Sequence, residues 1–508
     1  MTTWASALLD PTVSIHWLLE IEAGGEVLRY ADADLNVGAH PYRGALGMVS
    51  EPTLRSDPYV GETGAVSCQV ELQPLMDGGP DRPLFRAHDI GDTYRVEFIG
   101  LVARVYRWAA GSAESERNLI IDGHITDANV SRESILSLGI SDFSVFYSTK
   151  ILPPILIDLA TFPDASEDDI GRRLPLVYGA FGGLEVPQIA STGDKHGIGH
   201  HIGSIDNGRV DETNNTPALT NTALSSGVEY AELDFSISTD GLTAVVGGTG
   251  VLDDDAGTYT GTPDALLAHT ADQLHHLARE IVGIPREKID AFSFVALRAK
   301  TASLVNTIIV DADESVNFFK VASVALAPYR GTVCAEHGQL VARLLDFNAP
   351  PAAALVEGEN ASVVDRAEWP GFKNVPAGLE LEYGKQWDRK RKKFRKMLVL
   401  SIEPADYTPF AVAMSRGATK LRVSYPYILD PTTAEALVAG IKELYAKNRR
   451  RLSVIVSREC HDLLLYETVS LTWADAPSAN GEGWVEKIFA VVGIAYGTDE
   501  STLQLLEC

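Results

Sequence analysis

The chain has 508 residues and a formal net charge of −26 at neutral pH, with an isoelectric point of about 4.8. Hydrophobic residues make up 45% of the chain, which is enough to bury the cores of about three or four domains. The charge argues against a general nucleic-acid-binding protein, because phosphate contacts need a basic surface. The sequence has no apolar run long enough to cross a bilayer.

The N-terminus and the cysteines indicate synthesis in a reducing compartment. The opening residues, MTTWASALLDPTVSIHW, lack the positive start and apolar core of a signal peptide. The cysteines are widely scattered and form no CxxC pair, so we expect free thiols and no metal or disulfide: Cys68, Cys334, Cys460 and Cys508.

Residues 1–160 are predicted to form a β-rich domain. A short helix over 4–9 is followed by a hairpin that turns at Gly24 and Gly25. Alternation of apolar and polar residues predicts further strands over 66–72, 94–101, 102–108, 118–125, 141–147 and 151–157. Many short strands separated by glycine-rich and charged loops favour a barrel or a sandwich.

A connector is expected over 161–182. Asp164 or Ser166 can cap a short acidic turn, which Gly171 ends. Leu174 to Gly179 then reads as an extended segment, because Pro175 disfavours the helical conformation at the residue before it. The local pattern is therefore a turn, an extended crossing and a second turn.

Residues 183–260 are predicted to form a second β-rich domain, with strands over 229–237 and 243–246 and an exposed loop over 207–227. Its candidate metal ligands are His196, His200 and His201. His196 and His200 would share a face only on a helix, and glycines lie within that interval, so we favour a structural histidine group over a metal site. Residues 253–255 are three aspartates that lack the spaced ligands of a helix-loop-helix calcium loop, which favours a solvated turn.

Residues 261–348 are predicted to be helical with a hairpin. Thr262 is a suitable N-cap, and Pro263 a suitable first residue, for a helix that Gly283 ends. His275 and His276 lie on this helix and are expected to be packed or surface histidines. A second helix opens at Pro285 and a third follows residue 315, before a hairpin over 331–345.

A proline- and alanine-rich linker over 349–359 precedes a C-terminal domain over 360–508, which is expected to be barrel-like with one helix from residue 431. This domain contains a basic interaction patch. It faces either an acidic partner or DNA, or it is a solvated strand edge whose charges prevent pairing with another strand. We favour the solvated strand edge. The patch consists of Arg389, Lys390, Arg391, Lys392, Lys393, Arg395 and Lys396.

Three stretches carry a resemblance to a known family. They are the connector FPDASEDDIGRRLPLVYG, the helix and hairpin block over 262–345, and YPYILDPTTAEALVAGIKELYAKNRRR near the C-terminus. In their order, these stretches resemble the baseplate hub or tail-tip proteins of long-tailed, siphovirus-like bacteriophages and gene transfer agents. The fold class expected is mainly β with α+β modules, in several small barrel or sandwich domains joined by helical segments.

The resemblance implies a homotrimer in which two barrel-like domains per subunit make a pseudo-sixfold ring. Such a ring meets the hexameric tail tube or the distal tail ring, and joins it to the central fibre or tip proteins and the tape-measure protein. It gates release of DNA, which passes without specific binding and which an acidic surface would not retain. The protein would be made in the bacterial host cytoplasm and reside in the virion at the tail tip, without a cofactor.

Three alternatives remain open: a distal tail or adaptor ring protein, a tail-associated cell-wall hydrolase, and a host-glycan-binding tip protein that uses 182–261. The sequence contains no GxSxG, HExxH, P-loop or CxxC motif, which favours a protein that is not an enzyme. Acidic residues are so frequent that a pair of catalytic carboxylates cannot be singled out.

Overall fold

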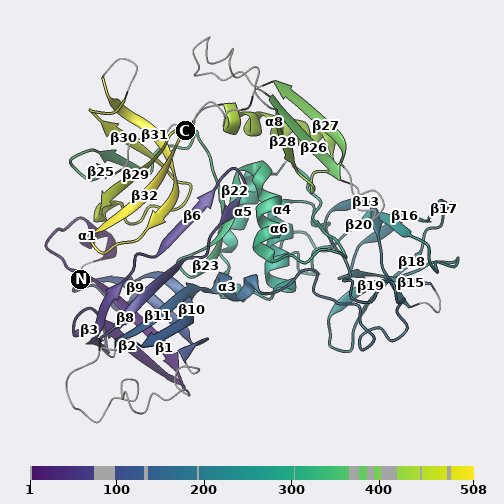
Figure 1. Ribbon diagram of the computed structural model, residues 1–508, viewed down its shortest axis with the longest axis horizontal. Helices are drawn as coiled ribbons and strands as arrows, with labels where there is room; N and C mark the ends of the chain where they lie inside the picture. Colours follow the sequence, from purple (N-terminus) through teal and green to yellow (C-terminus); the bar gives the residue numbers. More distant parts are fainter. Residues whose placement is uncertain are drawn as a thin grey trace.

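The computed structural model describes residues 3–73, 98–130, 135–190, 194–302, 304–364, 376, 378–385, 394–401, 420–446, 449–477 and 482–508. Strands account for 44% and helices for 17%, divided among several sheets, which confirms the prediction of a mainly β, multi-domain chain. Figure 1 shows two large sheets beside each other, a central group of helices, and a smaller β-rich module at the opposite end. Within the described residues, no helix is both long and apolar enough to cross a bilayer.

The N-terminal part forms a nine-stranded sheet with the order β3-β4-β2-β1-β9-β10-β11-β8-β5. The predicted hairpin is confirmed, and Gly24 and Gly25 both take positive φ angles in its turn. Helix α1 (Trp4–Leu8) precedes the sheet, and η1 (Glu114–Glu116) is a short 3-10 turn. The strands are β1 (Ile15–Ala23), β2 (Glu26–Ala31), β3 (Leu35–Val37), β4 (His40–Gly44), β5 (Leu46–Val49), β8 (Ser67–Leu72), β9 (Val102–Ala109), β10 (Asn118–Val130) and β11 (Leu136–Asp142).

Two strand predictions, over 141–147 and 151–157, are wrong. Residues 143–148 form a helix, α3 (Phe143–Ser148), because the carboxylate of Asp142 accepts a hydrogen bond from the amide of Ser144 and caps it. The stretch 151–157 makes only isolated bridges, at Leu152 and Leu156. Of the strand predicted over 94–101, residues 94–97 lie outside the described residues, and the remainder is a turn.

The connector leads into the second β-rich module. Its acidic turn and extended crossing are confirmed, and β12 (Leu176–Val177) pairs with β21 (Ile309–Val310). Two four-stranded sheets follow, with the orders β13-β20-β16-β17 and β14-β15-β19-β18. Their strands are β13 (Ala180–Glu185), β14 (Gln188–Ala190), β15 (Lys195–Gly199), β16 (Ser204–Val210), β17 (Thr213–Asn214), β18 (Ala218–Ala223), β19 (Glu229–Asp234) and β20 (Ala244–Thr249).

The exposed loop predicted over 207–227 is wrong, because that stretch contains β17, β18 and most of β16. Strand β18 has no buried residue, and its partners are the backbone groups of β19. A strand held mainly by its backbone hydrogen bonds leaves no hydrophobic alternation in the sequence.

The middle of the chain contains α4 (Thr270–His276), which continues as a π-helical turn η2 (Leu277–Ile281), then η3 (Arg286–Lys288), α5 (Ala291–Lys300), α6 (Phe318–Leu326) and η4 (Ala327–Tyr329). The helix start predicted at Thr262 is wrong. Asp264 has a positive φ of 55°, and Leu266 bridges Leu252, so this stretch is tied to the preceding module. The second helix starts at Ala291 instead of Pro285, since the carboxylate of Asp290 caps it there.

The predicted hairpin after α6 is confirmed as β22 (Gly331–Glu336) and β23 (Gln339–Leu344), which turn at His337 and Gly338. The stretch predicted to be a linker contains β24 (Ala353–Val356), which pairs in parallel with β30 (Thr468–Trp473). A separate three-stranded sheet has the order β27-β26-β28 and is formed by β26 (Gly378–Lys385), β27 (Phe394–Ser401) and β28 (Leu421–Ser424).

The C-terminal sheet has the order β24-β30-β31-β32-β29-β25. Its edge strands are consecutive in the chain, and a bridge between Glu357 and Ala361 brings their ends together, so the sheet returns on itself as a barrel does. Helix α8 (Pro431–Ala446) and the 3-10 turn η6 (Arg458–Cys460) flank it. The other strands are β25 (Ala361–Val363), β29 (Arg451–Ser457), β31 (Trp484–Ala495) and β32 (Glu500–Glu507).

The two large sheets interlock although most of the chain separates them. Strand β6 (Thr53–Asp57), which also pairs with β7 (Glu62–Thr63), leaves the N-terminal region and pairs with β31 of the C-terminal sheet. Buried residues of both sheets belong to one hydrophobic core, which joins Leu19 and Val105 to Val454 and Phe489. Burial of apolar area at about 25 cal/mol per Å² drives such packing, so the two sheets are expected to be one rigid unit.

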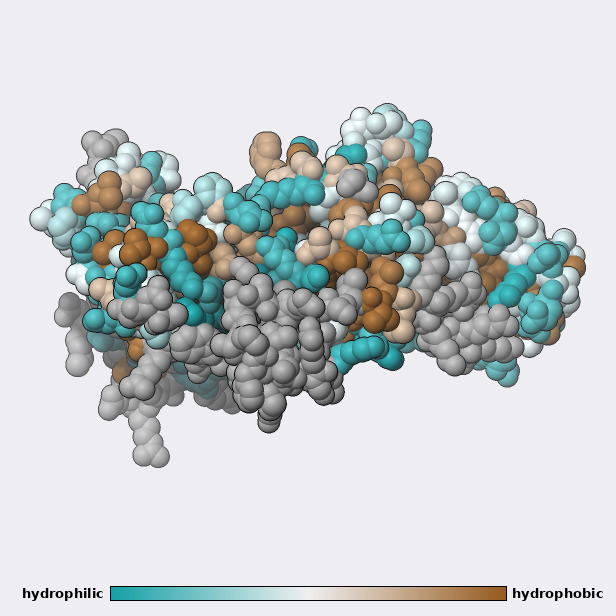
Figure 2. Space-filling view, turned by 90° about the horizontal axis from the view of Figure 1, so that it is seen from above, coloured by the Kyte–Doolittle hydropathy of each residue, from teal (hydrophilic) through white to brown (hydrophobic). Residues whose placement is uncertain are grey.

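The outer surface is mixed in character. Figure 2 shows several separate hydrophobic patches among hydrophilic side chains on one face of the molecule. The most exposed large apolar residues include Phe292 and Val295 of α5, with 85% and 64% of their surface accessible, and Met397 and Val399 of β27. The four cysteines have no disulfide partner, as predicted.

Candidate functional site

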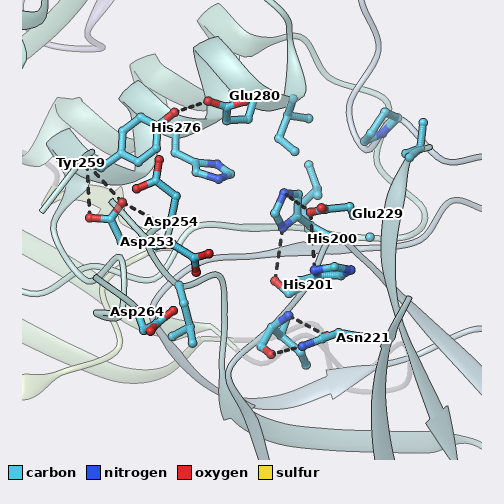
Figure 3. Close-up of a pocket in the computed structure, with 18 of the residues that line it drawn as sticks. His200, His201, Asn221, Glu229, Asp253, Asp254, Tyr259, Asp264, His276 and Glu280 are labelled. Atoms are coloured by element: carbon cyan, nitrogen blue, oxygen red, sulfur yellow. Dashed lines mark hydrogen bonds and ion pairs between the residues drawn. The ribbon is translucent and has the colours of Figure 1, made fainter. Parts of the chain in front are cut away.

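A pocket with a volume of about 900 Å³ lies where the second β-rich module meets α4 and η2. Figure 3 shows His200, His201 and Glu229 on one side of the pocket and Asp253, Asp254 and Asp264 on the other. Three segments that are distant in the sequence supply its histidines and carboxylates: the end of β15 with the start of β19, the loop 252–264, and the turn from α4 into η2. The lining is completed by Pro154, Ile155, Leu176 and Asn221, among others.

Strand pairing positions the first side of the pocket. Strands β15 and β19 are antiparallel with Gly199 opposite Tyr230, so the next residue, His200, lies opposite Glu229. The amide of His200 donates to the carbonyl of Glu229 at 3.2 Å, which fixes both backbones. His200 itself has a positive φ of 97°, and this turn directs the chain from β15 toward β16.

The side chains on this side meet around one carboxylate oxygen. Oε2 of Glu229 lies 3.5 Å from Nε2 of His200 and 3.6 Å from Nδ1 of His201. The other ring nitrogen of each histidine faces a backbone carbonyl. Nδ1 of His200 lies 3.3 Å from the carbonyl oxygen of His201, and Nε2 of His201 lies 2.9 Å from the carbonyl oxygen of Thr222. Burial lowers the pKa of His200, so its imidazole is neutral at pH 7.

The opposite side is a loop that its own aspartates hold in shape. The carboxylate of Asp253 accepts hydrogen bonds from the amides of Tyr259 and Thr260 and from the Thr260 hydroxyl. Asp254 accepts from the amide and hydroxyl of Thr258, and these bonds lower its pKa. These two carboxylates therefore order the turn. The sequence predicted a solvated turn, which holds for Asp255 and Asp264 at its exposed edge but not for Asp253, which is buried.

The floor of the pocket comes from the helical turn. His276, on α4, is 5% exposed, and burial lowers its pKa to about 3. Its Nδ1 lies 3.0 Å from the hydroxyl of Tyr178, a fully buried residue of the connector motif. Tyr259 donates its hydroxyl hydrogen to Glu280 of η2, and burial raises the pKa of Tyr259. The helix, the loop and the connector are thus tied together at this point.

The charge of the lining is strongly unbalanced. No lysine or arginine occurs among the residues that line the pocket, whereas six carboxylates do: Glu229, Asp253, Asp254, Asp255, Asp264 and Glu280. The nearest paired cation is Arg279, whose Nε lies 3.1 Å from Glu280. A site of this kind favours a cationic ligand.

The structure separates the three predicted histidines. His196 lies inside the module, with Nδ1 at 2.9 Å from the carbonyl of Val186 and Nε2 at 3.0 Å from the hydroxyl of Thr239. It serves packing and does not line the pocket, whereas His200 and His201 do. In the described part of the chain, no group of three or more histidine, cysteine, aspartate or glutamate residues is arranged to hold a metal ion.

The predicted basic patch falls largely outside the described residues. Residues 389–393 are among those not described, and Arg395 and Lys396 lie in β27 by their backbone alone. The neighbouring Lys385, at the end of β26, has its Nζ 3.6 Å from Oε1 of Glu314.

Sequence reasoning missed most of this pocket. It noted the histidines after β15 and the three aspartates separately, and it treated His276 as an ordinary packed residue of a helix. Glu229, Tyr259 and Glu280 carried no signal, because only the folded chain brings them together with the others. The sequence feature that could have indicated the pocket is the local density of histidine and aspartate in two stretches of one module.

The fold and the pocket can be compared with those of known proteins. No family model matches the sequence, and no curated protein matches it. Among the solved structures to which the chain is similar are two tail proteins and a chain of a gene transfer agent virion.

Among them is the tail protein from Neisseria meningitidis MC58, with 11% identity over 97% of this chain and 96% of that chain and a TM-score of 0.41. The 43 kDa tail protein of prophage MuSo2 from Shewanella oneidensis has 10% identity over 97% of this chain and 98% of that chain, with a TM-score of 0.39. A chain of the native gene transfer agent virion has 10% identity over 68% of this chain and 85% of that chain, with a TM-score of 0.41.

Proposed function

We propose that the protein is a structural hub at the tip of a phage-like tail, which joins the tail tube or distal tail ring to the central fibre. The observation that carries the proposal is the pairing of β6 with β31, which fastens the N-terminal and C-terminal sheets into one unit. A subunit with two rigidly joined sheets can present two similar elements to a ring. Three such subunits give six positions around an axis, which matches a hexameric tube.

The modular architecture supports a mechanical role rather than a catalytic one. The two large sheets share a core, and a second core joins the β-rich module, the helices and the three-stranded sheet. Two cores within one chain permit movement of one body against the other, which gating at a tail tip requires. Release of DNA through the ring is the function that we assign to such a movement.

The charge of the chain supports passage of DNA without retention. With a net charge of −26, most surfaces of the chain carry an excess of carboxylates, and a channel lined by them would repel phosphates, so DNA would slide through without forming ion pairs. We place acidic residues of the sheets on the channel side, and not the basic patch that the sequence predicted. A trimer whose channel is lined by Arg389 to Lys396 would contradict this assignment.

The test is co-assembly with a tail-tube protein. The purified chain is mixed with a purified tail-tube protein, and the mass of the complex is measured by analytical ultracentrifugation and native mass spectrometry. A complex of three hub chains with six tube chains is the expected result. A complex with six copies of this chain would identify it as a distal tail or adaptor ring instead, and clearing of cell walls in a zymogram would identify a hydrolase.

A further inference from the structure

The pocket between β15, β19 and α4 has a set of hydrogen-bonding atoms that the hub role leaves unused. We propose that it receives a lysine- or arginine-bearing peptide segment of a neighbouring protein, with the cationic side chain at Glu229 and a peptide carbonyl at His276. This proposal is independent of the trimer and of the DNA channel.

The first step is the charge of the pocket. Its lining has six carboxylates and no lysine or arginine. Two of them, Asp253 and Asp254, are occupied by bonds within their own loop, and Glu280 is bonded to Tyr259 and paired with Arg279. Glu229 faces His200 and His201 but no lysine or arginine in the described chain, and Asp255 and Asp264 are exposed, so these three carboxylates attract a cation.

The second step is the convergence of acceptors at Glu229. A histidine nitrogen that faces a backbone carbonyl must donate to it, so Nδ1 of His200 and Nε2 of His201 hold the ring hydrogens. The remaining nitrogens both lie within 3.6 Å of Oε2 of Glu229, and Nε2 of His200, whose pKa is lowered by burial, is an acceptor. A carboxylate oxygen and Nε2 of His200 that meet at one point suit a group with several N–H bonds and a positive charge, as an ammonium or guanidinium group has.

The third step is a buried donor aimed into the pocket. The hydroxyl of Tyr178 is fully buried and Nδ1 of His276 is its hydrogen-bond partner, so the hydroxyl donates and Nδ1 accepts. Nε2 of His276 then carries a hydrogen. It has no hydrogen-bond partner among the described residues, and Figure 3 shows its ring between Tyr259 and His200. An acceptor atom of a ligand in the pocket can therefore bond to it.

A basic peptide satisfies both requirements. It supplies a cationic side chain for the acceptors and a main-chain carbonyl for the His276 donor. A polyamine supplies the cation without the acceptor, and a neutral oligosaccharide supplies hydroxyl groups without the charge. The pocket volume of about 900 Å³ lies within the usual range of ligand pockets, roughly 300–1,000 Å³.

The experiment uses the full chain and a fluorescein-labelled peptide of sequence Gly-Lys-Arg-Lys-Gly, with binding followed by fluorescence anisotropy. Glu229→Gln is expected to weaken the peptide about tenfold or more, since it removes a charged hydrogen bond. The matched control is Glu26→Gln, an exposed glutamate of β2 in the other module, which should leave the affinity unchanged. His276→Phe keeps the ring and removes the donor, so it should weaken the peptide severalfold while leaving spermidine binding unchanged.

Several results would overturn the proposal. One is the absence of peptide binding by a folded chain, and another is equal weakening by Glu229→Gln and Glu26→Gln, which would indicate attraction by the overall charge alone. Binding of an uncharged cell-wall oligosaccharide, or of Zn²⁺, that displaces the peptide and depends on Glu229 would assign the pocket to a different ligand. Near-ultraviolet circular dichroism checks each fold, and Asp255→Asn, at an exposed position, replaces Glu229→Gln if that variant fails to fold.

Discussion

Arg107 donates a hydrogen bond from Nη1 to Nδ1 of His461 at 2.7 Å, which joins β9 of the first sheet to the turn after η6 in the last domain. The same nitrogen donates to the carbonyl of Gly497 at 3.1 Å. The guanidinium lies over the rings of Trp4 and Tyr496, and burial lowers its pKa to about 10. A buried cation between two sheets that are distant in sequence marks the contact on which the rigid unit depends.

The first prediction concerns the volume of Arg107, which is fully buried. Arg107→Ala should lower the free energy of unfolding by about 3–5 kcal/mol, because it leaves a cavity between the sheets and removes the partner of His461. Arg107→Met fills most of the space without a buried charge, and its cost should be less than half as large. Urea denaturation of both variants measures the difference, and equal costs would show that packing is not the main contribution.

The second prediction concerns pH. Burial lowers the pKa of His461 to about 3, from an ordinary value of 6.5 in the unfolded chain. The folded chain therefore binds this proton only at a lower pH than the unfolded chain does. Above pH 6.5 the His461 proton does not affect the free energy of unfolding, and as the pH falls from 6.5 toward 3 it lowers that free energy. One pH unit corresponds to about 1.4 kcal/mol per group, so at pH 5 the loss from His461 is about 2 kcal/mol.

Asp142 has the opposite effect on the free energy of unfolding. Burial raises its pKa to about 6, so as the pH falls the folded chain binds the Asp142 proton before the unfolded chain does, which stabilises the fold. The measurement therefore compares the wild type with His461→Gln, whose amide can still accept from Arg107. Between pH 7.5 and pH 5, the free energy of unfolding of the variant should fall by about 2 kcal/mol less than that of the wild type. The same slope in both proteins would show that His461 is not kept neutral by the fold.

The third prediction concerns Gly179, which ends the connector motif. Its φ is 76°, and an added Cβ would lie 2.4 Å from the carbonyl oxygen of Asn306. Gly179→Ala should therefore cost more than the roughly 1–2 kcal/mol of a left-handed residue alone. Gly171→Ala is the matched control, since its φ is 89° but nothing lies within 4 Å of an added Cβ. If thermal unfolding shifts equally in both variants, the close approach at Gly179 has no energetic effect.

The fourth prediction concerns Arg172 in the same connector, which contacts three carboxylates. Its nitrogens lie 2.5 Å from Asp169, 3.2 Å from Glu185 and 2.8 Å from Asp313, and these partners raise its pKa. Arg172→Met removes the cation from this largely buried cluster and should destabilise the fold by about 3–5 kcal/mol. Arg172→Lys should restore only part of the loss, because a lysine cannot reproduce the planar fork.

The control for that experiment is Arg422→Met. Arg422 pairs with Glu380 and Glu382 on β26, but its side chain is 60% exposed. Solvent screens such a pair, so little change in the thermal midpoint is expected. A large change at Arg422 together with a small one at Arg172 would contradict the assignment of the connector as a structural joint.

Residue patterns predicted the strands that have one buried face. β8 and β9 alternate apolar and polar side chains, or carry a long apolar run, and were found near their expected bounds of 66–72 and 102–108. β18 was missed because its side chains are not buried. The helix expected at Thr262 has the right capping chemistry, but the bridge from Leu266 to Leu252 overrides it.

The pocket was less accessible to sequence reasoning than the fold. The histidines after β15 and the aspartates of the loop drew notice as separate groups. Their meeting with His276 depends on the packing of α4 against the connector through Tyr178. A contact of this kind, between residues 98 positions apart, leaves no periodic or local pattern in the sequence.

The most direct test of the hub proposal is the rotational symmetry of the isolated assembly, measured by electron microscopy of the purified full chain. The account predicts a threefold ring in which the N-terminal and C-terminal sheets alternate at similar distance from the axis, giving six sheet positions. A sixfold ring with one sheet per position, or a chain that remains monomeric at high concentration, would contradict it.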